Sequence, residues 1–178
     1  MSREVLLRSA AREDAPAVAR VHVRSWQAAY RGLLPQDYLD RLRPQDRAQH
    51  YDFAATDPRK PATIVAVEGE AVVGFATVAA ARDPDVSDAG ELCALYVDPQ
   101  WWGQHVGSAL IAHGRARLEA LGFRDAVLWV LAGNARAQRF YDRDGWRRDG
   151  AQRTACVWGM PVEEIRFRRL LQPAGPKL

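Results

Sequence analysis

The chain contains little cysteine and no long apolar segment. Its two cysteines, Cys93 and Cys156, lie too far apart to form a metal-binding pair, and no cluster of histidine, cysteine and aspartate suggests a metal site. No apolar run reaches the length of about eighteen residues that a membrane span requires. The apolar patch at residues 5–7 is too short for a secretory signal. We therefore expect a cytoplasmic protein without a metal, whose cysteines stay reduced and whose Cys93 packs as a small core residue.

The charge balance is only weakly basic. The formal net charge is +3, and the arginines are scattered rather than gathered in a run that alternates with aromatic residues, as in single-strand nucleic-acid binders. Nucleic-acid binding is therefore the weakest of the functions that we consider. A length of 178 residues with 48% apolar content suits one globular domain. We place this domain at residues 4–171 and expect a loose tail at residues 172–178.

Apolar periodicity predicts an alternation of helices and strands. A stripe that recurs every four residues predicts a helix over residues 14–30, and residues 36–54 are expected to form a second helical region, broken near Pro44. Later helices are expected at 106–121, with Leu121 on its apolar face, and at 135–143. Strands are expected at 4–8, 62–68, 71–80, 91–97, 126–131, 146–150 and 164–170, with a less clear one at 154–158. The segment 57–61 is expected to be a loop.

Two of these strands, 91–97 and 126–131, are almost continuously apolar, as central strands covered on both faces are. A strand, a helix and a second strand of this kind predict a parallel right-handed crossover. The expected fold is an α/β layered domain. It has a mixed, mostly antiparallel sheet with one central parallel pair, and helices on both faces.

The segment Leu95–Ile111 predicts a strand, an Asp-Pro break, a glycine-containing loop and a helix start. Such a loop directs several main-chain N–H groups at one place, beside the positive end of the helix dipole, which favours a phosphate or pyrophosphate. A P-loop does not fit, because Gly107 is followed by Ser108 rather than lysine, and a dinucleotide fingerprint does not fit, because position 105 is histidine. An ordinary strand–loop–helix junction is the alternative.

Residues Trp102 to Gly107 fit the pattern (R/Q)-x-x-G-x-(G/A) better, and Asn134, Ala137 and Tyr141 fit N-x-x-A-x-x-x-Y. In these motifs the chain resembles the GNAT superfamily of N-acetyltransferases, over roughly residues 4–171. The loop departs from the family pattern at Trp102, where arginine or glutamine is usual, and at position 105, where glycine is usual. The resemblance implies acetyl-CoA as co-substrate, held in a slot where strands 91–97 and 126–131 splay apart.

The resemblance also implies roles for individual residues. The pyrophosphate is expected on Trp102, Gly103, Gln104, His105, Val106, Gly107 and Ser108, where the Ser108 hydroxyl can add a contact. The pantetheine arm is expected on Asn134, Ala137, Tyr141 and the main chain of Leu95, Tyr96 and Val97, where a strand bulge would free an N–H.

Two side chains are expected to move protons. Glu91, eleven residues before Trp102, is the expected general base, acting through a relay water with its pKa raised by burial. Tyr141 is the expected proton donor to the CoA thiolate. A solvent-facing glutamate at a strand end and a core tyrosine beside Phe140 are the respective alternatives, and for Ser108 the alternative is a plain first-turn serine.

His22, Trp26 and Tyr30 share one face of the first helix, where the resemblance places the wall of the acceptor pocket; core packing is the alternative. We expect no role for His50 or His113. The predicted function is acetyl transfer from acetyl-CoA to a primary amine of an unidentified small molecule or protein, by direct attack in a ternary complex. A non-catalytic acyl-CoA-binding or sensing module is the alternative. No nucleic-acid or membrane partner is expected, and a homodimer through the C-terminal strands is implied only by the resemblance.

Overall fold

The computed structural model describes residues 4–53, 57 and 60–171, so the predicted tail at 172–178 and part of the predicted loop at 57–61 lie outside the described residues. The strands are β1 (Leu6–Ser9), β2 (Ala62–Glu68), β3 (Ala71–Ala80), β4 (Gly90–Val97), β5 (Asp125–Leu131), β6 (Arg147–Val157) and β7 (Met160–Leu170). The helices are α1 (Ala15–Ala29), α2 (Gln36–Arg41), α3 (Pro44–Ala48), α4 (Val106–Ala120) and α5 (Ala135–Arg143). Short 3₁₀ turns are η1 (Arg12–Asp14), η2 (Pro84–Val86) and η3 (Pro99–Trp101).

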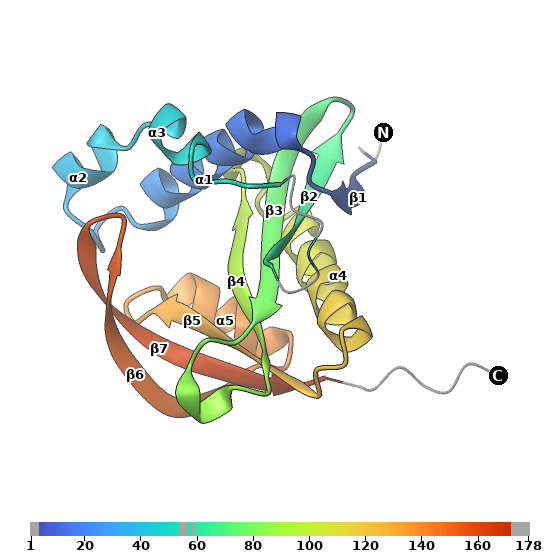
Figure 1. Ribbon diagram of the computed structural model, residues 1–178. Helices are drawn as coiled ribbons and strands as arrows, with labels where there is room; N and C mark the ends of the chain where they lie inside the picture. Colours follow the sequence, from blue (N-terminus) through green and yellow to red (C-terminus); the bar gives the residue numbers. More distant parts are fainter. Residues whose placement is uncertain (1–3, 54–56, 58–59, 172–178) are drawn as a thin grey trace.

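Across these described ranges the strands form one sheet in the order β1-β2-β3-β4-β5-β7-β6. Neighbouring strands pair antiparallel except β4 and β5, which pair parallel, so the predicted mixed sheet with one central parallel pair is confirmed. The parallel register joins Gly90 to Ala126 and Glu91 to Val127. Beyond these pairs the strands diverge, and Figure 1 shows the sheet opening into two half-sheets, β1 to β4 and β5 to β7.

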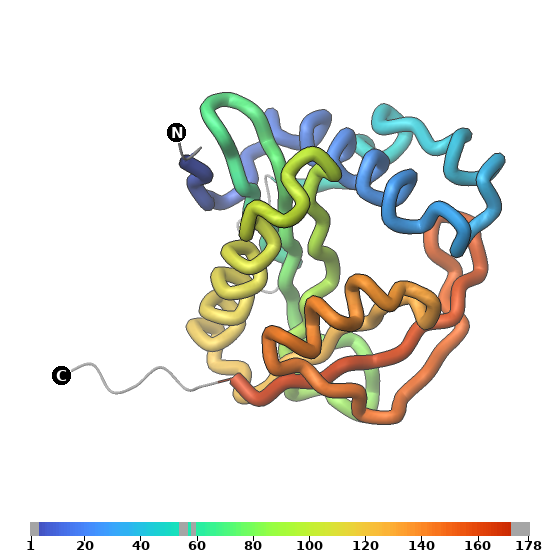
Figure 2. The backbone as a smooth tube through the Cα atoms, turned by 180° about the vertical axis from the view of Figure 1, so that it is seen from behind, coloured from blue at the N-terminus to red at the C-terminus, as the bar shows by residue number. Residues whose placement is uncertain are grey.

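Helices cover both faces of the first half-sheet. On β2, Ile64 and Ala66 belong to the core that includes α4, whereas Val65 and Val67 pack in a second core with α1. The alternation follows from the strand pleat, which sends successive side chains to opposite faces. Figure 2, viewed from behind, shows α4 and α5 on the near side of the sheet.

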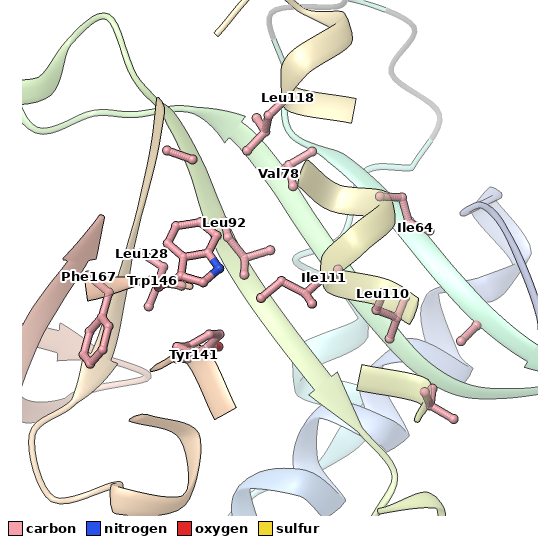
Figure 3. Packing of buried hydrophobic residues seen from close by; sticks show 14 of the residues in the cluster. Ile64, Val78, Leu92, Leu110, Ile111, Leu118, Leu128, Tyr141, Trp146 and Phe167 are labelled. Atoms are coloured by element: carbon pink, nitrogen blue, oxygen red, sulfur yellow. The ribbon is translucent and has the colours of Figure 1, made fainter. Parts of the chain in front are cut away.

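The main core joins the two half-sheets. Figure 3 shows Leu110, Ile111 and Leu118 of α4 against the strands of the first half-sheet, with Trp146, which precedes β6, and Phe167 of β7 nearby. Trp146, Phe167 and Leu110 are fully buried. Because one continuous apolar core underlies both halves, the opening between β4 and β5 has rigid walls.

Cys93 is not the small core residue that we expected. The register between β3 and β4 shifts so that Thr77 pairs with Ala94 and Val78 pairs with Leu92. Cys93 is therefore the extra residue of a β-bulge, and its side chain is exposed. The bulge that we expected at residues 95–97 lies here instead.

Three further expectations differ from the structure. The first strand begins and ends later than the predicted 4–8. One strand, β6, replaces the two separate strands expected at 146–150 and 154–158. The interruption expected between them is an irregularity inside the strand: the register with β7 shifts between Arg148 and Gln152, around Gly150 with φ of 92°. Leu121, expected on the apolar face of the helix at 106–121, follows the last residue of α4 and is 38% exposed.

Candidate active site

The loop after β4 is folded back on the end of its strand. The Asp98 carboxylate accepts a hydrogen bond from the Gln100 N–H (3.0 Å) and pairs with Arg24 (3.2 Å), which fixes the turn that follows β4. Trp102 then donates from Nε1 to the carbonyl of Val97 (2.9 Å). These contacts direct the second half of the loop toward the start of α4.

The start of α4 presents main-chain N–H groups without helical acceptors. Val106, Gly107 and Ser108 form its first turn, where an α-helix provides no intrahelical partner, and the His105 side chain makes no capping hydrogen bond. Gly103 and His105 have left-handed φ values of 77° and 63°, a conformation that turns the amides of such a loop toward one side. With the positive end of the helix dipole, this site is suited to phosphate groups.

A cleft of about 1190 Å³ runs between the half-sheets and along α1. Its volume exceeds that of an ordinary small-ligand pocket, roughly 300–1,000 Å³, so it has room for two substrates. Its lining includes the following predicted residues: Leu95, Tyr96, Val97, Trp102, Gly103, His105, Val106, Gly107, Ser108, Asn134, Ala137, Tyr141, Glu91, Trp26 and Tyr30. Gln104, also predicted for this loop, does not line the cleft, and its side-chain amide donates to the Gln100 carbonyl (2.9 Å).

The helix α5 carries the second motif. Asn134 caps it, with Oδ1 accepting from the Ala137 N–H (3.1 Å), so the amide NH₂ of Asn134 is left to donate elsewhere. Tyr141 lies two turns further on the same helix, is 9% exposed and packs edge-on against Phe140. Burial raises the pKa of the Tyr141 phenol. The hydroxyl therefore stays protonated at neutral pH and remains a donor.

Glu91 lies at the point where the half-sheets separate. It lines the cleft but is only 7% exposed, so the solvent-facing alternative is wrong. Burial raises the pKa of its carboxyl, with a further contribution from Asp83, while Arg82 and Arg153 oppose the shift. A carboxyl with a raised pKa is better matched to proton transfer near neutral pH than an ordinary glutamate.

Cys93, beside Glu91, lines the same cleft. The cleft walls desolvate its thiol and, with the Glu91 carboxylate, raise the pKa of Cys93 to about 12. At neutral pH the thiol is therefore protonated and a poor nucleophile.

Arg136 of α5 is a cleft residue that the sequence did not point to. Its guanidinium lies 3.5 Å from the centroid of the Trp102 ring, within the range of a cation–π interaction. The loop thus carries tryptophan where the GNAT pattern has arginine or glutamine, and α5 brings a positive charge to that tryptophan.

The predicted cluster on α1 lies on the wall of the cleft. His22 and Trp26 are 5% and 4% exposed, and both line the cleft with Tyr30. His22 Nδ1 lies 2.5 Å from the Tyr51 hydroxyl. Burial holds the pKa of His22 well below its ordinary value, and Arg47 lowers it further, so the imidazole is neutral. His50, for which we expected no role, also lines the cleft.

Two observations concern metal and membrane. Within residues 4–53, 57 and 60–171, no group of three or more histidine, cysteine, aspartate or glutamate side chains could hold a metal ion. No helix in the same ranges combines the length and apolarity needed to cross a membrane.

The comparisons with known proteins agree with this geometry. The sequence model of the acetyltransferase (GNAT) family matches residues 22–146. The N-acetyltransferase YuaI of Bacillus subtilis, itself uncharacterized, is 32% identical over 130 residues, which cover 73% of each chain. The PaiA N-acetyltransferase of Thermoplasma acidophilum, solved in complex with coenzyme A, has a TM-score of 0.70 at 16% identity and covers 94% of this chain and 99% of its own. YncA of Salmonella typhimurium, solved with acetyl-CoA, has a TM-score of 0.68 at 20% identity and covers 96% of both chains.

The split sheet, the first turn of α4 and the cleft between them form a site that is suited to a phosphate-bearing ligand. The family match covers more than half of the chain. The chain belongs to the acetyltransferase (GNAT) family, as its motifs predicted, and its enzyme class is that of the N-acetyltransferases.

Proposed function

We propose that this protein transfers the acetyl group of acetyl-CoA to a primary amine by direct attack in a ternary complex. One observation carries the proposal: the free N–H groups at the start of α4 face the same cleft as Glu91 and Tyr141. The cleft therefore joins a site for phosphate to a base and an acid. The PaiA and YncA structures, which hold coenzyme A and acetyl-CoA, share this fold.

The loop and α5 are suited to hold the coenzyme. The amides of residues 103 and 105–108 bind the pyrophosphate, and Arg136, resting on Trp102, adds positive charge. The Asn134 side chain and the main chain of residues 95–97 bind the pantetheine arm. Because β5 does not pair with that stretch of β4 in the described residues, the main-chain groups on its β5 side have no strand partner, although the Val97 carbonyl already accepts hydrogen bonds from Ser25 and Trp102.

In the proposed reaction, Glu91 accepts a proton from the attacking amine through a water molecule. The amine nitrogen bonds to the acetyl carbonyl carbon, and the carbon–sulfur bond breaks. Tyr141 gives its phenolic proton, or a hydrogen bond, to the departing thiolate. Because burial raises the pKa of Tyr141, the phenol stays neutral and the hydrogen bond to the thiolate is the favoured form of this donation, while main-chain N–H groups of β4 stabilise the charge that develops on the carbonyl oxygen.

The test combines coenzyme binding with turnover. Acetyl-CoA should raise the melting temperature, and release of free thiol should accompany acetylation across a panel of amines. Tyr141→Phe should lower kcat by roughly a hundredfold or more, the usual contribution of a proton donor, while the Kd for CoA stays within twofold. Tyr38→Phe is a control for coenzyme binding, because the Tyr38 hydroxyl donates to the carbonyl of residue 158 (3.0 Å) outside this coenzyme site, and the Kd for CoA should be unchanged.

Binding without turnover, for every amine tested, would instead support the acyl-CoA-binding module. No binding of acetyl-CoA would reject both functions.

A further inference from the structure

Arg47 lies on the wall of the cleft opposite the coenzyme loop. It follows the start of α3, is half-buried and lines the cleft. Its guanidinium lies 4.5 Å from the centroid of the Trp158 ring and 5.5 Å from that of Tyr51. The Tyr51 hydroxyl in turn lies 2.5 Å from Nδ1 of the neutral His22. Arg47 is therefore flanked by aromatic side chains from two parts of the chain.

This guanidinium has no anionic partner within the described part of the chain. Its Nε is buried and makes no hydrogen bond there, and no carboxylate lies within ion-pair distance of it. Two other cations of the cleft do have carboxylate partners: Lys60 pairs with Asp52 (3.6 Å) and Arg153 with Glu164 (2.7 Å). Partial burial of a cation with an N–H donor that makes no hydrogen bond is unfavourable unless an anion binds to it.

The position of Trp158 is a second, independent observation. Trp158 and Gly159 form the two-residue turn between β6 and β7, with φ values of 50° and 75°. Such a hairpin turn normally uses asparagine and glycine, and a bulky side chain seldom adopts this left-handed conformation. Here the indole stacks on Trp26 at 4.1 Å and carries Arg47 on its ring. A strained residue that presents its side chain to a cleft is a common mark of a binding site.

We propose that Arg47 binds a carboxylate of the acetyl acceptor, so that the acceptor is an amine that also carries a carboxylate and an apolar or aromatic body. The inference rests on the proposed function and specifies the substrate class of the same cleft. A guanidinium held over an indole face by a cation–π contact can still direct its N–H groups at a planar carboxylate. The walls next to it are the rings of His22, Trp26 and Tyr51, with the imidazole uncharged, so the rest of the acceptor meets apolar surface.

The experiment compares acids with their neutral analogues. Phenylalanine, methionine and 6-aminohexanoate are assayed by thiol release against the corresponding primary amides and, for phenylalanine, against phenethylamine. The native enzyme should show a kcat/KM for at least one acid that exceeds that of its amide by tenfold or more. Arg47→Gln should lower kcat/KM for that acid by roughly 10- to 150-fold, the usual effect of removing a charged hydrogen-bond donor, and leave the amide within threefold. Arg41→Gln, an exposed arginine on the adjacent α2, is the control and should change neither.

The outcomes separate this inference from the proposed function. If the native enzyme acetylates amines with no preference for the acid, or if Arg47→Gln lowers acid and amide equally, the inference is overturned while the proposed function stands. If no amine is acetylated and acetyl-CoA does not bind, the proposed function fails first. A second measurement needs no variant. The carboxylates 3-phenylpropionate and hexanoate lack the amine, and 3-phenylpropionate should inhibit the native enzyme competitively against the amine substrate. If neither compound inhibits, the result counts against the carboxylate site.

Discussion

Replacement of His105 by glycine should stabilise the protein. His105 is the residue before the first turn of α4, with φ of 63° and ψ of 5°. The left-handed region places a Cβ against the following carbonyl, which glycine avoids. The imidazole is exposed and makes no capping hydrogen bond, so its loss removes no contact that the structure assigns to it.

The magnitude follows from two opposing terms. A left-handed residue with a Cβ costs roughly 1–2 kcal/mol, and histidine lies toward the low end because it tolerates this region better than most side chains. Glycine loses more conformational freedom on folding, which offsets roughly 0.5–1 kcal/mol. With a strain cost of about 1 kcal/mol, the net gain in unfolding free energy should be small, about 0–0.5 kcal/mol. For a chain of this size that corresponds to a rise of at most about 2 °C in melting temperature.

Thermal denaturation of His105→Gly and His105→Ala provides the assay. Alanine keeps the Cβ and removes the imidazole, so its melting temperature should stay close to that of the native protein. If alanine raised the melting temperature as much as glycine, the imidazole rather than the backbone would be responsible. If glycine lowered it, the reasoning from left-handed strain would be refuted.

Two further predictions concern charge. Arg136→Gln should weaken CoA binding by about tenfold through loss of a charged hydrogen-bond donor, and more at low than at high salt. Arg139→Gln, which changes an exposed neighbour on α5, should not weaken it. Calorimetric titration at two salt concentrations checks this, and equal effects of the two substitutions would contradict it. Glu91→Gln should lower kcat by roughly a hundredfold or more. The pKa of Glu91 is raised in the folded state. Ionisation of this carboxyl therefore lowers the free energy of unfolding as pH rises from the unfolded-state pKa, about 4.3, through the folded-state pKa. The stability of Glu91→Gln relative to native protein should therefore increase over that range in urea titrations, and a constant difference would count against the burial argument.

Elements with strong local signals were predictable from the sequence. The strands at 62–68 and 71–80 have their predicted bounds because Gly69 supplies the left-handed turn between them, with φ of 58°. The helix at 135–143 has its predicted bounds because Asn134 caps it. The parallel crossover was predictable from two continuously apolar strands on either side of a helix.

The features that were missed depend on pairing between distant segments. The bulge at Cys93 arises from the register of β4 against β3 and leaves no mark in local composition. Arg47, Tyr51 and Trp158 meet only when α3 and the turn between β6 and β7 approach α1. Neither residue spacing nor periodicity predicts such a contact between distant segments.

The meeting point of β4 and β5 has a consequence for what can enter the sheet. A Cβ at Gly90 would lie 2.7 Å from Leu118 Cδ2, so helix and strand are in contact at the vertex. From there two rows of backbone donors and acceptors face one another at an angle. Edges of this kind ordinarily recruit strands from other molecules and seed aggregation. A full strand needs about 4.8 Å on either side, roughly 10 Å in all, which excludes it from the narrow end. Slender, extended molecules can reach further in, so the wedge shape favours such a molecule over the addition of a further β-strand.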